Sequence, residues 1–294
     1  MRLIPWASFV ALLFLPVPLH GQCVNDRRSN RNAGILIGDS AITGTQSISA
    51  TELASVASEL IGSCFDEDSE ELEQEIRTAF QDHGYFAAKV NSLGFKAHDP
   101  LGVPKPVILE ADVSDGPRYK LAEITFVENH AFSSAELRDQ FQLKRGDVIE
   151  RAKIAGGLMG LRKLYRSRGF LDWAAIPDVQ FASNATATLE VSLREGTQYH
   201  LQKLNIVADK EIAARLRAEW KLADGEVYDD SYVDQYVELN RNLLPSGFDK
   251  ASIQRIQNCP DGVVEVRLLI DPAEDPLHTV PKNVPCKEQQ DVSK

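Results

Sequence analysis

The sequence Ser114-Asp-Gly-Pro-Arg-Tyr-Lys-Leu-Ala-Glu-Ile-Thr-Phe-Val-Glu-Asn129 reads as a turn followed by a strand. Gly116 and Pro117 predict the turn, and the apolar residues after them predict a half-buried strand. The pattern returns as Arg194-Glu-Gly-Thr-Gln-Tyr-His-Leu-Gln-Lys-Leu-Asn-Ile-Val-Ala-Asp209. The matched positions lie 80 residues apart: Gly116 and Gly196, Tyr119 and Tyr199, Leu121 and Leu201, Ile124 and Leu204, and Phe126 and Ile206. A fixed period with matched apolar positions indicates a repeat protein.

Periodicity predicts the order β-α-α-β-β three times. In the first repeat a strand starts at 35–37, helices cover 49–61 and 69–83, and strands cover 86–95 and 107–113. In the second, a strand covers 119–127, Ser133 or Ser134 caps a short helix, a long helix covers 148–168, and strands cover 170–181 and 189–193. In the third, a strand covers 199–207, helices cover 212–220 and 231–244, and strands cover 250–257 and 263–270. Ser49 or Thr51 caps the first helix.

Short motifs recur at matching places in the repeats. A glycine followed by an aromatic residue stands at the end of each second helix: Gly84-Tyr85, Gly169-Phe170 and Gly247-Phe248. An acidic residue and a glycine precede the next repeat at Asp115-Gly116 and Glu195-Gly196, and Gly-Asp-Val and Gly-Glu-Val turns precede the second and third repeats' long helices. In an exported chain, this pattern resembles the polypeptide-transport-associated (POTRA) domain.

The resemblance implies an α+β fold of three tandem POTRA-like units, each a three-stranded mixed sheet with two helices on one face. The expected units are residues 34–116, 117–196 and 197–272, followed by a disordered, proline-containing tail at 273–294. Similar arrays form the periplasmic arm of outer-membrane-protein assembly factors and two-partner secretion transporters. Members of that family normally continue into a membrane barrel, and the 22 residues after Pro272 are too few for one. The sequence therefore predicts the binding part without the barrel.

The N-terminus reads as a signal peptide over 1–21, with Arg2 before a short apolar run and Gly21 before the cut. Lipidation of Cys23 is the alternative, although Gln22 before it is not the small residue that such a site normally has. Export permits disulfides among Cys23, Cys64, Cys259 and Cys286. Four cysteines allow three connectivities, and pairing of sequence neighbours is the weakly preferred one.

Composition and charge exclude several classes of function. Hydrophobic residues make up 43% and charged residues 26% of the 294-residue chain, as in a soluble globular protein, and the net charge of −11 argues against non-specific nucleic-acid binding. The charge is uneven: residues 35–117 carry −11, residues 118–197 carry +2 and residues 198–272 carry −4. The six histidines show no metal-ligand spacing, and no nucleophile, zinc or phosphate-binding motif is present. The prediction is a protein without catalytic residues, cofactor or metal.

Binding is expected at a sheet edge, where unpaired backbone groups can accept an extended chain. By resemblance, the strand after the second helix forms that edge. In the middle repeat, the candidate partner-binding residues are Leu171, Asp172, Trp173, Ala174 and Ile176. Trp173 either contacts a client or packs on a helix, and Pro177 limits the length of any added strand. Gly116-Pro117 and Gly196-Thr197 are the predicted joints between units, and such short links predict a semi-rigid arm.

Two stretches have competing interpretations. Gly156-Gly-Leu-Met-Gly160 contains a G-x-x-x-G pattern, which indicates close helix–sheet packing rather than a membrane dimer. Arg162, Lys163, Arg166 and Arg168 either stabilise a helix C-terminus or contact the acidic first unit or an acidic partner.

The resulting hypothesis is a periplasmic scaffold, possessing no transmembrane span, that binds unfolded clients or an outer-membrane barrel protein during assembly or secretion. The alternative is a structural adaptor for one envelope protein.

Overall fold

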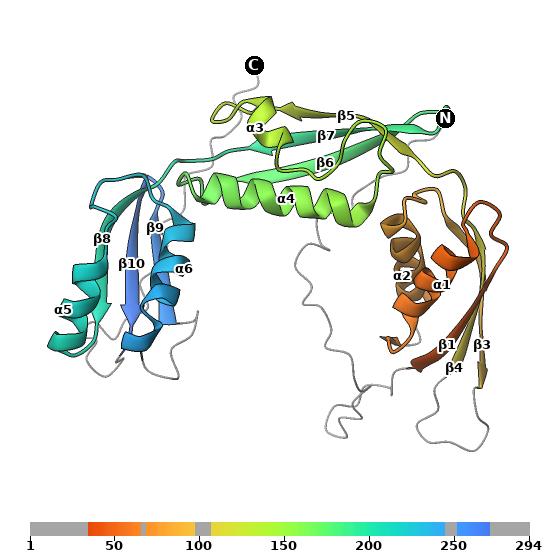
Figure 1. Cartoon of the computed structure of the whole chain (residues 1–294), viewed down its shortest axis with the longest axis horizontal. Helices are drawn as coiled ribbons and strands as arrows, with labels where there is room; N and C mark the ends of the chain where they lie inside the picture. The colour runs from red at the N-terminus through yellow and green to blue at the C-terminus, as the bar shows by residue number, and fades with distance from the viewer. Residues whose placement is uncertain (1–34, 66–68, 98–106, 245–251, 271–294) are drawn as a thin grey trace. The chain divides into compact units, whose positions relative to one another are not determined.

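The computed structural model describes residues 35–65, 69–97, 107–244 and 252–270. The predicted signal peptide, the tail at 273–294 and the Gly247-Phe248 step lie outside these residues. Within them, the β-α-α-β-β order occurs three times (Figure 1). None of the described helices is long and apolar enough to cross a membrane.

The first repeat packs two helices on one face of a mixed sheet (Figure 1). Its elements are β1 (Ile35–Thr43), α1 (Ala50–Leu60), β2 (Cys64–Phe65), α2 (Ser69–Asp82), β3 (Lys89–Ala97) and β4 (Val107–Ser114). The strand order is β2-β1-β4-β3, with β1 parallel and β3 antiparallel to β4. The two-residue β2, which pairs antiparallel with β1, is an addition to the three predicted strands.

The start of α1 follows from a capping box. The Ser49 hydroxyl accepts the backbone N–H of Glu52, and the Glu52 carboxylate accepts the N–H of Ser49. Ser49, rather than Thr51, is therefore the cap. Apolar side chains of β1, of both helices, of the segment between α2 and β3 and of β4 then form one core: Ile37, Val56, Leu60, Leu72, Ile76, Ala79, Phe80, Tyr85, Ala88, Leu109, Ala111 and Val113.

The middle repeat has the sheet order β5-β7-β6. Its elements are β5 (Lys120–Val127), α3 (Ser134–Arg138), α4 (Arg151–Arg166), β6 (Ala174–Phe181) and β7 (Thr186–Arg194). Every second side chain of β7 from Ala187 to Leu193 is buried, as expected for a strand with one face in a core. Ser133 is the residue that caps α3, because its hydroxyl accepts the N–H of Glu136.

Helix α4 is shorter than predicted at its start. Val148 forms a bridge with Lys120, and the N–H of Ile149 donates to the carbonyl of Tyr119. Val148 and Ile149 are therefore held by the start of the first strand and do not join the helix, which begins at Arg151. The prediction failed here because Val148 and Ile149 have the spacing of a helix but are held by a tertiary contact.

The third repeat has the order β8-β10-β9, with β10 parallel to β8 and antiparallel to β9. Its elements are β8 (His200–Val207), α5 (Lys210–Glu219), α6 (Asp230–Leu239), a 3-10 turn η2 (Arg241–Leu243), β9 (Ile253–Asn258) and β10 (Val263–Leu269). Buried residues of both helices and all three strands form a single cluster that includes Leu201, Leu216, Val233, Ile253 and Val266. The helix predicted to reach 244 ends at Leu239.

Packing divides the chain into two compact parts, and the division runs through the middle repeat. One part reaches Phe126 and also holds residues 138–158 and 176–191, while the other holds 127–137, 159–175 and the chain from Ser192 onward. Helix α4 thus contributes its first half to one part and its second half to the other. The repeat boundaries at 116/117 and 196/197 stay predictions.

The glycine pair in α4 packs differently from the expectation. A Cβ on Gly157 would lie 2.0 Å from the ring of Phe141, whereas a Cβ on Gly156 would meet nothing within 4 Å. Close packing is therefore present at Gly157, against an aromatic residue that follows α3, and it does not follow the G-x-x-x-G spacing.

Candidate functional site

The strand after the second helix lies at a sheet edge in every repeat. These strands are β3, β6 and β9, and in the described part of the chain no further strand pairs with their outer sides. The edge position that the resemblance implied for this strand is thus observed three times. At the opposite edge lie β5 in the middle repeat and β8 in the third, which are the first strands of their repeats, whereas in the first repeat the two-residue β2 lies outside β1.

That opposite edge is covered by the segment between the two helices. In each repeat this segment exchanges two backbone hydrogen bonds with one residue of the first strand. The donors and acceptors are Gly62 to Ile37 and Ile37 to Ser63, Gly146 to Leu121 and Leu121 to Asp147, and Gly225 to Leu201 and Leu201 to Glu226. The Gly-Asp-Val and Gly-Glu-Val turns noted in the sequence, and the Gly62 turn of the first repeat, therefore cover one edge of each sheet, and β3, β6 or β9 lies at the other edge.

The candidate partner-binding residues occupy different environments. Ile176 on β6 is 59% exposed, Asp172 is exposed and Ala174 is half-buried, while Leu171 is buried. Trp173 is half-buried and stacks on Tyr165 of α4, with ring centroids 5.3 Å apart and planes 11° apart. This contact corresponds to the helix-packing alternative. The role of these five residues in binding stays a prediction.

The predicted joint residues include two glycines with left-handed backbones. Gly116 has φ of 67° and Gly196 has φ of 74°, a region that glycine enters without a steric penalty. A Cβ on Gly116 would lie 3.0 Å from the Cβ of Ala87. A Cβ on Gly196 would lie 3.4 Å from the Cβ of Asp172. Pro117 is exposed, and the Thr197 hydroxyl oxygen lies 3.7 Å from the sulfur of buried Cys259.

The acidic residue before each joint glycine binds backbone amides. Asp115, only 3% exposed, accepts N–H groups of Gln46, Ser47 and Ile48, the last two at 2.6 and 2.7 Å. Burial alone would raise the pKa of Asp115, but these amide bonds outweigh it and hold the pKa below its usual range.

Glu195 does the same in the middle repeat. It accepts the N–H groups of His130 and Ala131 and the hydroxyl of Tyr165. The acidic–glycine motif therefore fixes the loop after the first strand of its own repeat, immediately before the chain enters the next.

One further glycine accepts a backbone hydrogen bond at each joint. The N–H of Tyr119 donates to the carbonyl of Gly84 at 3.4 Å, and the N–H of Tyr199 donates to the carbonyl of Gly169 at 2.8 Å. Gly84 has φ of 90° and Gly169 has φ of 81°. We define the first joint as the contacts around Gly84 and Tyr119 and the second joint as the contacts around Gly169 and Tyr199.

The first joint combines aromatic rings and ion pairs. Phe181 lies 5.4 Å from Phe86 and 4.5 Å from Tyr119, measured between ring centroids. Arg151, the first residue of α4, forms a two-bond ion pair with Asp82, the last residue of α2, at 3.0 and 2.9 Å.

Arg118 adds two more contacts at the first joint. Its guanidinium pairs with Glu52 at 2.8 Å and donates to the carbonyl of His83 at 3.1 Å.

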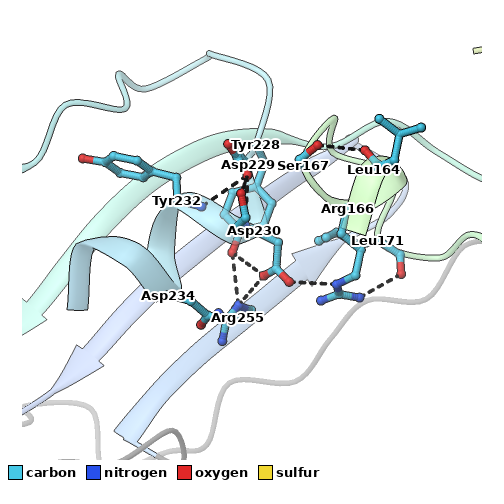
Figure 2. A network of polar contacts seen from close by, with 11 residues as sticks. Leu164, Arg166, Ser167, Leu171, Tyr228, Asp229, Asp230, Tyr232, Asp234 and Arg255 are labelled. Atoms are coloured by element: carbon cyan, nitrogen blue, oxygen red, sulfur yellow. Dashed lines mark hydrogen bonds and ion pairs between the residues drawn. The ribbon is translucent and has the colours of Figure 1, made fainter. Parts of the chain in front are cut away.

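The second joint is centred on Asp230, the first residue of α6 (Figure 2). Its Oδ2 accepts Nε of Arg166 at 2.7 Å, and its Oδ1 accepts Nε of Arg255 at 2.6 Å. The hydroxyl of Tyr228 donates to Oδ1 at 3.1 Å, and Arg255 also binds Asp234 at 2.9 Å. Two cations and a phenol thus share one carboxylate, whose side chain is 14% exposed.

The charges in this network stabilise one another. Burial would raise the pKa of Asp230, but the hydrogen bond and charge of Arg166, the charge of Arg255 and the Tyr228 hydroxyl outweigh it and lower the pKa. Burial would likewise lower the pKa of Arg255, and the oxygens of Tyr228 and Asp230 raise it above its usual value instead. Asp230 therefore stays ionised while it bridges the two arginines.

Arg166 was one of four basic residues with two competing interpretations. It lies in the last turn of α4, and its guanidinium binds Asp230 of the third repeat and the carbonyl of Leu171. Asp82, Arg151, Asp230 and Arg255 were not identified from the sequence. Their signal was weak, because the paired residues are 64 to 69 positions apart or lie on separate elements.

No group of three or more His, Cys, Asp or Glu side chains in the described ranges is arranged to hold a metal ion. A hollow of about 270 Å³ lies beside α4 and is lined by Gln140, Gln142, Ala152, Lys153, Gly156 and Gly157. The features that stand out in this part of the chain are therefore edges and joints.

Comparisons with known proteins agree with this geometry. Residues 119–196 match the family model "POTRA", described as "Surface antigen variable number repeat". A curated protein of Treponema pallidum (strain Nichols), described as "Putative outer membrane protein assembly factor", is 21% identical over 172 residues. The match covers 58% of this chain and 20% of that protein, so the chain spans about a fifth of this relative's length.

Among solved structures, the crystal structure of POTRA domains 3–5 of Haemophilus influenzae BamA is similar. It is 19% identical, with a TM-score of 0.55, and the match covers 80% of this chain and 95% of that one. At this identity the likeness concerns the fold. The predicted resemblance to a POTRA array and the predicted α+β repeat fold are confirmed.

Proposed function

We propose that this chain is a non-enzymatic periplasmic scaffold that binds polypeptides at its sheet edges during outer-membrane protein assembly or secretion. The supporting observation is the asymmetry of the edges: each sheet uses its inter-helix segment to cover the first strand and leaves β3, β6 or β9 at the other edge. An edge strand offers backbone donors and acceptors to an extended chain of almost any sequence. The similarity to a putative assembly factor and the POTRA-like fold support a role in outer-membrane protein assembly.

Strand β6 is the edge that the proposal assigns most specifically. Ile176 stands on its exposed face at 59% exposure, and Pro177 lacks a backbone donor, so the added strand pairs on one side of Pro177. The export signal predicted for residues 1–21 supports a periplasmic location. Intact-mass measurement of the mature protein tests cleavage, lipidation of Cys23 and the proposed disulfides together.

The test uses the full chain and a urea-unfolded outer-membrane barrel precursor that is diluted into buffer with it. Ile176→Lys places a charge on the edge, a substitution that discourages strand addition, and binding measured by fluorescence anisotropy should weaken roughly fivefold. Met159→Lys is the matched control, because Met159 on α4 is 60% exposed and lies on no sheet edge. Equal effects of the two variants would exclude edge binding at β6.

The alternative is an adaptor for one folded envelope protein. Affinity capture from envelope extract separates the two, since several barrel precursors support the scaffold and a single folded partner supports the adaptor. Hydrolysis of an envelope polymer by the purified protein would contradict both.

A further inference from the structure

The long helix of the middle repeat carries an arginine at each end. Arg151 is the first residue of α4 and Arg166 is the last. Each binds an aspartate of a neighbouring repeat: Asp82 is the last residue of α2, and Asp230 is the first residue of α6. At both joints the last residue of one long helix thus binds the first residue of the next repeat's long helix. The first joint has the acid before the base, and the second joint has the base before the acid.

The interaction of a charged side chain with its own helix dipole explains the charges at the second joint but not those at the first. A cation is favoured at a helix C-terminus and an anion at an N-terminus, so Arg166 and Asp230 each stabilise their own helix. Asp82 at the end of α2 and Arg151 at the start of α4 each oppose the dipole of their helix. The first joint therefore keeps two locally unfavourable charges, and the contact that compensates for them is their mutual ion pair.

We propose that these four residues specify which repeats can pack end to end. A contact that skipped the middle repeat would bring Asp82 against Asp230, and a contact between middle repeats of two copies would bring Arg166 against Arg151. Both pairings juxtapose like charges, which disfavours a wrong partner. The observed order brings opposite charges together at both joints. This role holds whichever polypeptide the edges bind.

The second joint is not a mirror image of the first, because Arg255 also binds Asp230. Arg255 lies on β9 and faces Asp230 independently of Arg166 (Figure 2). Exchange of charges between Arg166 and Asp230 would leave Arg255 beside a cation. The proposal therefore predicts that charge exchange is tolerated at the first joint and not at the second.

The backbone supplies a separate reporter for each joint. The Tyr119 amide reports on the first and the Tyr199 amide on the second, since each donates to a glycine carbonyl across its joint. Hydrogen exchange of both amides is measured by NMR on the full chain. Asp82→Arg should speed exchange at Tyr119 about three- to fivefold relative to Asp82→Asn, while Tyr199 stays unchanged as the internal control.

A role limited to the helix end predicts the reverse, because a cation at the end of α2 would suit its dipole. The double variant Asp82→Arg with Arg151→Asp should restore exchange at Tyr119 to the rate of the unmodified chain. Slower exchange in Asp82→Arg than in Asp82→Asn, or no recovery in the double variant, would overturn the proposal. Arg151→Gln provides a second neutral variant in case Asp82→Asn disturbs folding.

The corresponding swap of charges at the second joint is expected to give the opposite result. Arg166→Asp with Asp230→Arg should keep hydrogen exchange at Tyr199 about three- to fivefold faster than in the unmodified chain. Arg255 then faces the arginine introduced at position 230, and both swapped charges oppose the dipoles of their helices. Recovery at Tyr199 would show that Arg255 takes no part in specifying this joint.

Discussion

The two joints share one backbone arrangement and differ in the side chains around it. In both, a left-handed glycine accepts the amide of a tyrosine that opens the next repeat. At the first joint Tyr119 packs on Phe181, whereas at the second the hydroxyl of Tyr199 donates to Asp172 at 2.6 Å. The repeated motif thus determines where the chain bends, and the side chains give each joint its own chemistry. Aromatic contact resists salt, while ion pairs weaken as salt screens them.

The largest difference is expected at the glycines. Gly169→Ala should lower the free energy of unfolding by about 3 kcal/mol, because a Cβ would lie 2.5 Å from the carbonyl oxygen of Tyr199 and alanine also disfavours positive φ. Gly84→Ala should cost about 2 kcal/mol, because the nearest atom, also at 2.5 Å, belongs to the side chain of Val148. Urea denaturation followed by tryptophan fluorescence measures both.

Gly146→Ala separates the cost of a steric clash from the cost of a positive φ. Gly146 has φ of 91°, but a Cβ there would meet nothing within 4 Å. This variant should therefore cost only about 1 kcal/mol of backbone strain. If all three alanine variants lost equal stability, backbone conformation alone would account for the joint glycines.

Sequence reasoning identified the turn glycines because their signals are local, while the joints placed at 116/117 and 196/197 stay predictions. Gly84, Gly116, Gly169 and Gly196 stand where a chain must turn, and all four have positive φ. The edge position of β6 followed from the resemblance. The ion pairs could not be found in this way, because a helix-end charge has many possible partners until the tertiary structure exists. One clue was present: Asp82 and Arg151 stand at helix ends where their charges are unfavourable.

The role of the acidic–glycine motif shows the same limit. The sequence marked Asp115 and Glu195 as recurring residues, and the structure adds that they bind the amides of residues 46–48 and 130–131. The separation of 64 to 69 positions is bridged only when the last strand of a repeat lies beside the first. The repeat thus indicated that Asp115 and Glu195 matter, but the amides that they bind could be identified only from the sheet topology.

Removal of the aromatic contact should produce the next largest effect. Phe181→Ala deletes the half-buried ring that touches Phe86 and Tyr119, at a cost of about 2 kcal/mol. Exchange at the Tyr119 amide should rise, and the increase should be the same in 50 mM and 500 mM NaCl, because no charge is involved. Phe170→Ala is the aromatic control in the middle repeat, where Phe170 packs on Tyr165. An increase that depends on salt would contradict a purely apolar contribution of Phe181 to the first joint.

The smallest expected effect is the loss of stability of the second joint at acidic pH. Because the pKa of Asp230 is lowered in the folded chain, its stabilising effect is complete above the ordinary carboxyl pKa of about 4 and is lost as pH falls through the folded value. Exchange at the Tyr199 amide, normalised to rates in an unfolded peptide, should therefore increase as pH falls below about 4. Asp230→Asn should cost about 1 kcal/mol at neutral pH and abolish this increase.

Asp234→Asn is the matched control for that experiment. Asp234 also binds Arg255, but it is exposed and has no bond to Arg166. The variant should therefore retain the acid dependence at Tyr199. If Asp234→Asn and Asp230→Asn removed it equally, acid would act through Arg255 on β9 and not through the bond between Arg166 and Asp230. The second joint would then depend on the edge strand of the third repeat, and this coupling would distinguish it from the first joint, where aromatic rings and ion pairs act together.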